Sequence, residues 1–240
     1  MNRGIYVALS GTLAQQKRLD VLTNNLANVN TPGFKKDKAV FKIALPPAEN
    51  QIPPFKDKAF VETNSIVTDF STATHNQTGN PLDIAIDGDG FFEVMTPQGI
   101  RYTRDGGFKR NEIGELITAE GHQVMGDGGP IRIEGNEIKV DRDGNILVDG
   151  APVGKLKIVD FPKPYPLKKE MENLYALPPS INAVPSNAEI RQGFTESANV
   201  NVIGEMTSMI DVMRSYESYI KIMQSMDEAT GKVINEVGRF

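Results

Sequence analysis

The chain of 240 residues contains no cysteine and only two histidines, His75 and His122. Without cysteine the protein can form neither a disulfide bond nor a thiolate metal site, although this absence says nothing about the cellular compartment. Neither histidine has the spacing of a metal-ligand pair or stands beside a recognisable nucleophile motif. We therefore expect no metal site and no cofactor, and we interpret both histidines as solvated or turn residues.

Long apolar runs are also missing. Nothing approaches the roughly 18 consecutive apolar residues of a membrane-spanning helix. The apolar run within the first ten residues is short and is followed by charged residues such as Lys17 and Arg18, so we expect no cleavable secretory signal. A net charge of -5 gives no long-range attraction to nucleic acid. These absences predict a partner that is neither a nucleic acid nor the membrane interior.

The middle of the chain is rich in strand and turn signals. Apolar residues alternate at Leu82, Ile84 and Ile86, and again within 131–133 and 138–140. Repeated Asp-Gly pairs separate these runs, and glycine supplies the positive φ that tight hairpins need. The pattern predicts a compact antiparallel β domain.

Aspartates next to glycines also invite a calcium interpretation, above all Asp141, Asp143 and Gly144. With Gly144 at the sixth position of an EF-hand loop, however, Gly150 would stand where the bidentate glutamate belongs. Hairpin turns explain the same residues without a metal. Paired carboxylates for acid–base catalysis leave no signature in a sequence with 31 acidic residues, because such pairs form in space.

The two ends of the chain carry a different pattern. Residues 5–29 and 202–237 have apolar side chains at spacings of three and four, which is typical of a stripe along a helix. We expect Asn201 to cap the second helix and the segment from Asn30 to Gly33 to end the first. The side chains expected at helix interfaces, within and between subunits, are Leu19, Leu22, Leu26, Val29, Met206, Met209, Met213, Tyr216, Ile220 and Met223.

These patterns together predict an α+β fold in which the long terminal helices pair as a coiled-coil-like stalk around an inserted antiparallel β-rich domain. The simpler alternative is that both helices cover one side of a globular core. Helices of about 25 to 35 residues would be longer than such a core needs, which favours assembly. The expected segments are an N-terminal helix (1–33), an extended linker with edge strands (34–78), a β-rich outer domain (79–160), a proline-rich return linker (161–198) and a C-terminal helix (199–240).

Two short motifs are recognisable. The segment from Leu19 to Lys35, LDVLTNNLANVNTPGFK, resembles the N-terminal signature of the bacterial flagellar rod and hook axial proteins. The segment from Ser197 to Val202, SANVNV, resembles the start of their C-terminal helix. Thr23 departs from the usual small or aliphatic residue at its position. The motif residues in the first segment are Asn24, Asn25, Asn28, Thr31, Pro32, Gly33, Phe34 and Lys35.

The resemblance implies a structural subunit of the flagellar basal-body rod, which crosses the periplasm between the MS ring and the hook. The implied partners are other copies of the chain, neighbouring rod proteins and the flagellar type III export apparatus, through which the protein would pass without cleavage of a signal peptide. The length matches the rod proteins of this family that carry a single β domain. The resemblance implies no cofactor and no enzymatic activity.

The asparagines of the motif also have a physical interpretation. Asn24, Asn25 and Asn28 lie on adjoining turns, where their amides can hydrogen-bond across a packed helix interface and fix its register. The alternative is that they only cap the end of the helix.

Two functions of other classes remain open at this stage. One is an exported wall-degrading hydrolase with an acidic cleft in the β domain. The other is a trimeric adhesin or cap-like binding module that uses its helices only to trimerise.

Overall fold

The structure is a computed structural model, and it describes residues 3–44, 60–170 and 173–237. The chain forms two compact units, which we call the helical unit and the β unit. The helical unit consists of the described residues of 1–27, 37–69 and 200–240, and the β unit of those of 28–36 and 70–199. Each unit is therefore built from segments that lie far apart in the sequence.

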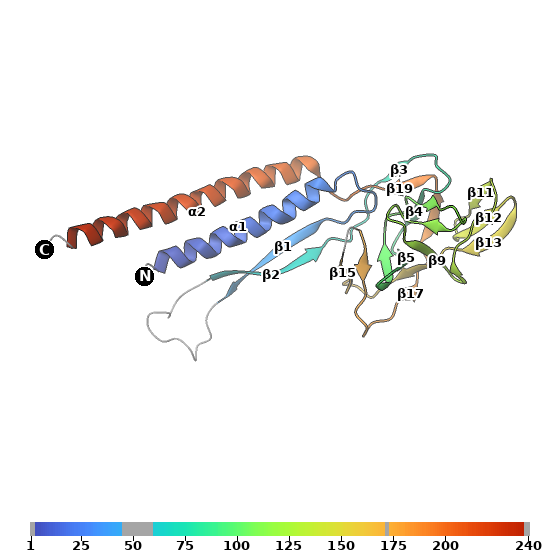
Figure 1. The fold of residues 1–240 in the computed structure, drawn as a ribbon, viewed down its shortest axis with the longest axis horizontal. Coiled ribbons are helices and arrows are strands. Elements are labelled where there is room, and N and C mark those ends of the chain that lie inside the picture. The colour runs from blue at the N-terminus through green and yellow to red at the C-terminus, as the bar shows by residue number, and fades with distance from the viewer. Residues whose placement is uncertain (1–2, 45–59, 171–172, 238–240) are drawn as a thin grey trace. The chain divides into compact units, whose positions relative to one another are not determined.

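The helical unit contains both long helices and one β-hairpin. Helix α1 spans Arg3–Ala27 and helix α2 spans Val202–Val237. Strand β1 (Asp37–Ala44) pairs antiparallel with β2 (Phe60–Thr68). Helix α1 contacts α2 and also both strands, so it lies between α2 and the hairpin (Figure 1). Neither described helix is long and apolar enough to cross a membrane.

The predicted α+β class is right, but the prediction that the two helices pair as a coiled-coil-like stalk is wrong. The described residues contain only these two helices, of 25 and 36 residues, beside many strands. The β1–β2 hairpin packs on α1 in the same unit as α2. The apolar periodicity located the helices correctly, but it carried no information about a hairpin that covers part of α1.

The ends of the helices are set by local hydrogen bonds. The prediction that Asn201 caps α2 is confirmed, because its Oδ1 accepts the N–H of Gly204 at 3.0 Å and its carbonyl oxygen accepts the N–H of Glu205 at 2.9 Å. Helix α1 ends at Ala27, a few residues before the predicted stop. The N–H of Thr31 then donates to the carbonyl oxygen of Asn28 at 3.1 Å, which turns the chain into the β unit.

The β unit is a set of antiparallel sheets. Seven strands form a path in the order β15-β16-β6-β5-β9-β8-β7, from which β10, β14 and β17 branch. A three-stranded sheet has the order β11-β12-β13, and the pairs β18-β4 and β19-β3 join late strands to early ones. The strands are β3 (His75–Gln77), β4 (Ile84–Asp87), β5 (Phe91–Thr96), β6 (Gly99–Thr103), β7 (Lys109–Arg110), β8 (Leu116–Ile117), β9 (Gln123–Gly126), β10 (Gly129–Pro130), β11 (Ile138–Val140), β12 (Asn145–Val148), β13 (Ala151–Lys155), β14 (Ile158–Asp160), β15 (Lys168–Lys169), β16 (Tyr175–Ala176), β17 (Val184–Pro185), β18 (Glu189–Gln192) and β19 (Phe194–Glu196).

Two apolar clusters form the core of the β unit. The larger contains Phe92, Phe108 and Leu116, all nearly inaccessible to solvent, and it joins strands from β4 to β18. The smaller is aromatic: Phe91, Tyr102 and Tyr175 gather there, and the ring of Phe70 packs edge-on against Phe91 with centroids 5.6 Å apart.

The turn interpretation of the aspartates is confirmed at residues 141–145. Asp141 Oδ1 accepts the N–H groups of Asp143 at 3.0 Å and Asn145 at 2.8 Å, and Gly144 takes a φ of +83°. The carboxylate therefore closes the β11–β12 hairpin.

The region expected to be a proline-rich return linker, 161–198, contains short strands. It supplies β15 to β19, two of which pair with the early strands β3 and β4. Strands of two to four residues between prolines are too short to show a period of two in the sequence.

Candidate assembly site

The helical unit exposes many large apolar side chains. Ile203, Met206, Ile210 and Met213 recur at spacings of three and four along α2 and therefore share one face of the helix. Ile203 is the most exposed of them, at 79%. A set of this kind is unusual for a surface that meets only water. The exposed large apolar side chains of the unit are Val7, Leu9, Leu13, Val40, Ile66, Val67, Val202, Ile203, Met206, Ile210, Met213, Ile222 and Ile234.

The residues predicted at helix interfaces fall into three groups. Leu22 is buried within the monomer, whereas Met206 and Met213 are about half exposed, at 51% and 48%. Val29 belongs to the β unit and is partly buried. The remaining residues are partly buried: Leu19, Leu26, Met209, Tyr216, Ile220 and Met223. Their role in contacts between subunits stays a prediction.

The side of α2 that packs within the monomer includes residues that the sequence interpretation did not select. Val212 is 1% exposed, although its neighbour Met213 was the predicted residue. A Cβ at Gly4 of α1 would collide with the side chain of Met226, and one at Gly11 would lie 2.7 Å from the ring of Tyr219. Glycines therefore let α1 approach α2 closely, and a search for large apolar residues does not find such a contact.

Asn25 joins three elements of the helical unit. Its side chain is buried, its Nδ2 donates to the carbonyl oxygen of Asp37 at 2.9 Å, and its Oδ1 accepts the N–H of Asp37 at 2.9 Å. The same Nδ2 lies 3.4 Å from Oε2 of Glu205 in α2. Asn25 thus fixes the end of α1 against the starts of β1 and α2. Asn28 Oδ1 accepts the hydroxyl of Thr31 at 3.3 Å, and Asn24 is exposed.

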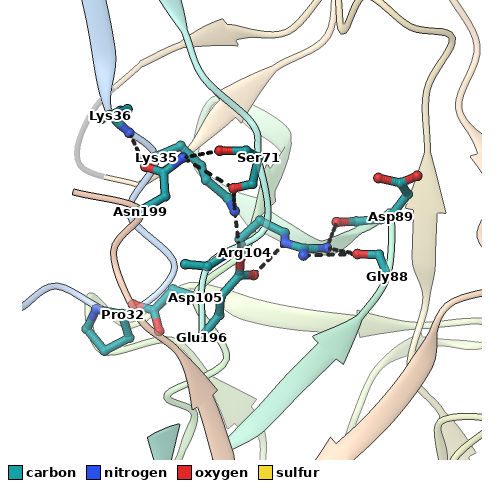
Figure 2. A network of polar contacts seen from close by, with 12 residues as sticks. Pro32, Lys35, Lys36, Ser71, Gly88, Asp89, Arg104, Asp105, Glu196 and Asn199 are labelled. Carbon is teal, nitrogen blue, oxygen red and sulfur yellow. Dashed lines mark hydrogen bonds and ion pairs between the residues drawn. The ribbon is translucent and has the colours of Figure 1, made fainter. Parts of the chain in front are cut away.

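The second half of the motif lies in the β unit. Phe34 and Lys35 are each 1% exposed. Lys35 Nζ lies 2.6 Å from Oε1 of Glu196, and Arg104 Nε lies 2.8 Å from Oε2 of the same carboxylate. Figure 2 shows this carboxylate held between the two cations. We call Lys35, Arg104 and Glu196 the charge cluster.

Further hydrogen bonds satisfy the charge cluster. Lys35 Nζ also donates to the carbonyl oxygen of Ser71 at 2.8 Å, and the N–H of Ala73 donates to Glu196 Oε1 at 2.9 Å. Burial alone would raise the pKa of the Glu196 carboxyl, but Arg104, Lys35 and the Ala73 amide together hold that pKa below its usual value. Glu196 is therefore a buried carboxylate whose charged form is stabilised by its neighbours.

Gly33 and the residues around it dock closely on the same region. Gly33 has a φ of +67°, and a Cβ there would collide with the backbone of Arg104 and Asp105. Its N–H donates to the carbonyl oxygen of Glu196 at 2.7 Å. Lys169 Nζ lies 3.9 Å from the centroid of the Phe34 ring, a cation–π contact.

Pro32 and Asn199 complete the docking of the motif. Asn173 Nδ2 donates to the carbonyl oxygen of Pro32 at 2.9 Å. Asn199 belongs to the second motif, and its Oδ1 accepts the N–H of Lys36 at 2.7 Å while its own N–H donates to the carbonyl oxygen of Phe34 at 3.3 Å (Figure 2). The end of the first motif and the start of the second are therefore neighbours in the β unit.

Sequence reasoning missed Arg104 and Glu196. They lie 92 residues apart, and Glu196 is 161 residues from Lys35, so no local pattern connects them. The one available signal was that Glu196 immediately precedes the second motif, which begins at Ser197.

Asp105 is a second unusual carboxyl of the β unit. Burial raises its pKa to about 6, partly opposed by the N–H of Gly107, which donates to its Oδ1 at 2.9 Å, and reinforced by the charges of Glu120 and Asp83. The residues that the structure describes contain no group of three or more histidine, aspartate or glutamate side chains arranged to hold a metal ion.

Comparison with known proteins gives matches along most of the chain. The flagella basal body rod protein family matches residues 5–35, the flagellar hook protein FlgE/F/G D1 domain matches 85–148, and the flagellar basal body rod FlgEFG protein C-terminal family matches 191–236. The flagellar basal-body rod protein FlgF of Caulobacter vibrioides is 32% identical, with 100% of both chains covered. FlgF of Rhizobium meliloti is 34% identical, with 99% of each covered. FlgG of Bacillus subtilis is 33% identical, over 98% of this chain and 99% of the relative.

Proposed function

Because the chain belongs to the flagellar basal-body rod protein family, we propose that its helical unit binds further copies of the chain and neighbouring rod proteins. The protein is a structural component of the flagellar basal body, not an enzyme. Membership of the family implies assembly with other basal-body proteins. The proposal concerns which surface carries that assembly and whether copies of this chain bind one another.

The apolar face of α2 is the observation that carries the proposal. Ile203, Met206, Ile210 and Met213 are all exposed along one side of the helix, and burial of such a face against another subunit would remove a large apolar area from water. A head-to-tail contact between unlike surfaces builds an open helical filament when its rotation does not close into a ring. The predicted residues Leu19, Leu26, Met209, Tyr216, Ile220 and Met223 belong to the same proposal.

The finer features of location and partnership are part of this proposal as well. We place the assembled rod in the periplasm, between the MS ring and the hook, and take the flagellar type III export apparatus as a transient partner. The support is the family resemblance of the two motifs, Leu19–Lys35 and Ser197–Val202. The division of the chain into five segments also stays a prediction.

Within the family, the motif favours FlgF over FlgG. The triplet Thr31-Pro32-Gly33 and the start from Asn2 to Tyr6 resemble FlgF more, since FlgG more often has two threonines before the glycine. Overall identity does not separate the two, because relatives of both names match at 32 to 34%. The comparisons give no support to the wall-degrading hydrolase or to the trimeric binding module.

The assembly surface can be tested with one substitution and a matched control. Met213→Asp places a charge on the exposed apolar face, whereas Ser218→Asp adds the same charge at an exposed polar position of α2 that lies off this face. We expect Met213→Asp to abolish incorporation into isolated basal bodies and to keep the purified protein monomeric in sedimentation at high concentration, with unchanged circular dichroism. Ser218→Asp should behave as the wild type. Normal incorporation of Met213→Asp would overturn the proposal.

A further inference from the structure

The helical unit exposes two separate groups of large apolar side chains, one on each helix. Among the described residues of α1, the exposed ones are Val7, Leu9 and Leu13, which we call the α1 patch. On α2, most of the exposed ones gather at the start of the helix. This second group, the α2 patch, consists of Val202, Ile203, Met206, Ile210 and Met213. Each helix therefore offers an apolar surface of its own to a partner.

The two patches lie at opposite ends of the helix pair, whose helices run in opposite directions (Figure 1). Because a Cβ added at Gly11 would meet the ring of Tyr219, the α1 patch is level with the part of α2 around Tyr219. The α2 patch is instead level with Asn25, whose Nδ2 lies 3.4 Å from Oε2 of Glu205. Tyr219 follows the middle of the α2 patch by about eleven residues, so the patches are offset by about 16 Å along the helices. Within one chain the α1 patch therefore does not cover the α2 patch.

The charges near the two patches have opposite signs. Up to Lys17 and Arg18, which are exposed, α1 contains basic but no acidic residues. The segment of α2 that carries its patch contains Glu205 and the exposed Asp211 but no basic residue. Contact between two α2 patches would bring acidic residues together, and contact between two α1 patches would bring basic ones together. Contact between an α1 patch and an α2 patch brings opposite charges together, which favours it over both symmetric arrangements.

We propose that the α1 patch of one copy packs on the α2 patch of the next copy. For copies that point in the same direction, this contact displaces one copy by about 16 Å along the helices. The inference rests on the proposed function, in which copies of this chain bind one another, and it adds which surfaces meet. In an open assembly, a contact between unlike patches leaves an α1 patch free at one end and an α2 patch free at the other, so further copies can add. The apolar side chains supply the area removed from water, and the charges select unlike over like patches.

Because the chain contains no cysteine, the pairing can be tested with single-cysteine variants of the full chain. A disulfide bond forms only where two Cβ atoms approach to about 4 Å. We expect an oxidised, concentrated mixture of Leu9→Cys and Ile210→Cys to give at least about tenfold more disulfide-linked dimer than either variant alone. Leu13→Cys mixed with Met206→Cys is a second pair in the same antiparallel register and should behave alike. Ser218→Cys, at an exposed position of α2 off the patch, is the control and should not link to Leu9→Cys.

The role of the charges is tested by exchanging them. Lys17→Glu in the Leu9→Cys chain should lower the yield of linked dimer with Ile210→Cys about threefold at low salt. Asp211→Lys in the Ile210→Cys chain should restore most of that yield, whereas Asp227→Lys, at an exposed position outside the α2 patch, should not. An unchanged yield for Lys17→Glu, or equal restoration by both lysine variants, would overturn the selection of unlike patches by charge.

The cross-linking results separate this inference from the proposed function. The absence of linked dimer from both mixtures would overturn the pairing, as would Ile210→Cys linking to itself as well as to Leu9→Cys, because two α2 patches would then meet. If Met213→Asp is excluded from basal bodies while neither mixture links, the assembly surface on α2 stands and only its pairing with α1 is overturned. If Met213→Asp is incorporated normally, the proposed function itself fails.

Discussion

The β unit buries many of its large apolar side chains in two clusters, whereas the helical unit leaves many of its own exposed. Phe92 and Val94 at the centre of the β unit are both 0% exposed. In the helical unit, Val212 is buried, but the exposed set runs along α2 from Val202 to Ile234. The two units belong to one chain, so overall composition does not explain the difference.

The difference teaches that the two units obtain their stability from different sources. The β unit closes its core from within one chain, including the charge cluster that joins its early and late segments. In the helical unit, none of the described residues buries Ile203, Met206 and Ile210 within one subunit. We infer that the β unit is stable within an isolated monomer, whereas the helical unit gains much of its stability from neighbouring subunits.

The largest effect should follow from opening the core of the β unit. Phe92 packs against Phe108 with ring centroids 5.0 Å apart, and Phe92→Ala should cost about 3 to 5 kcal/mol because it leaves a cavity among rigid neighbours. Urea titration followed by hydrogen exchange in β5 and β6 measures the loss. If the free energy of unfolding fell by less than about 1 kcal/mol, the β unit would be as loosely packed as the helical unit, which would contradict the difference between the two units.

A smaller effect should come from the motif glycine. Gly33→Ala combines backbone strain with a collision against Arg104 and Asp105, and we expect a loss of about 2 to 4 kcal/mol. Gly79→Ala is the matched control, because Gly79 also has a positive φ but no atom lies within 4 Å of an added Cβ. Faster amide hydrogen exchange in the β unit of Gly33→Ala should report the loss of stability. Equal losses of stability for both variants would show that the close contact of Gly33 with Arg104 and Asp105 is not the reason for a glycine at this position.

The sequence predicted the parts of this comparison that depend on local pattern. It located both helices, the Asn201 cap and the Asp-Gly turns, because each follows from side chains within a few residues. It did not predict the hairpin on α1 or the charge cluster. The sequence marks Lys35 only as a motif residue, because its partner Glu196 lies 161 residues away along the chain. Such pairs depend on the complete topology, which periodicity does not encode.

A pH-dependent effect of intermediate size should arise at Asp105. Its folded-state pKa of about 6 lies above the ordinary aspartate value of 3.8, so the folded state disfavours the charged form. The contribution of Asp105 to the stability of the β unit should therefore be greatest below about pH 4 and be lost as the pH rises towards 6. Asp105→Asn keeps an acceptor for Gly107 and should gain about 1 to 3 kcal/mol at pH 7 with a flatter pH profile.

The control for this effect is Asp141, whose carboxyl pKa is lowered, mainly by the side chain of Asn145. Asp141→Asn should not stabilise the protein at pH 7. A urea midpoint for Asp105→Asn that follows the wild-type pH profile from 4 to 7 would contradict the assignment.

The smallest effect on the monomer should come from the exposed face of α1, and it is the sharpest test of the comparison. Leu13 is 56% exposed and Leu22 is 8% exposed on the same helix. Leu13→Ser should change monomer stability by less than about 0.5 kcal/mol, whereas Leu22→Ser should cost about 2 kcal/mol or more. This difference between the two variants should disappear in basal bodies, because both variants should impair incorporation. If Leu13 matters only in the assembly, its side chain contacts neighbouring subunits. If Leu13→Ser instead lowered the stability of the dilute monomer as much as Leu22→Ser does, the helical unit would be stable without its neighbours.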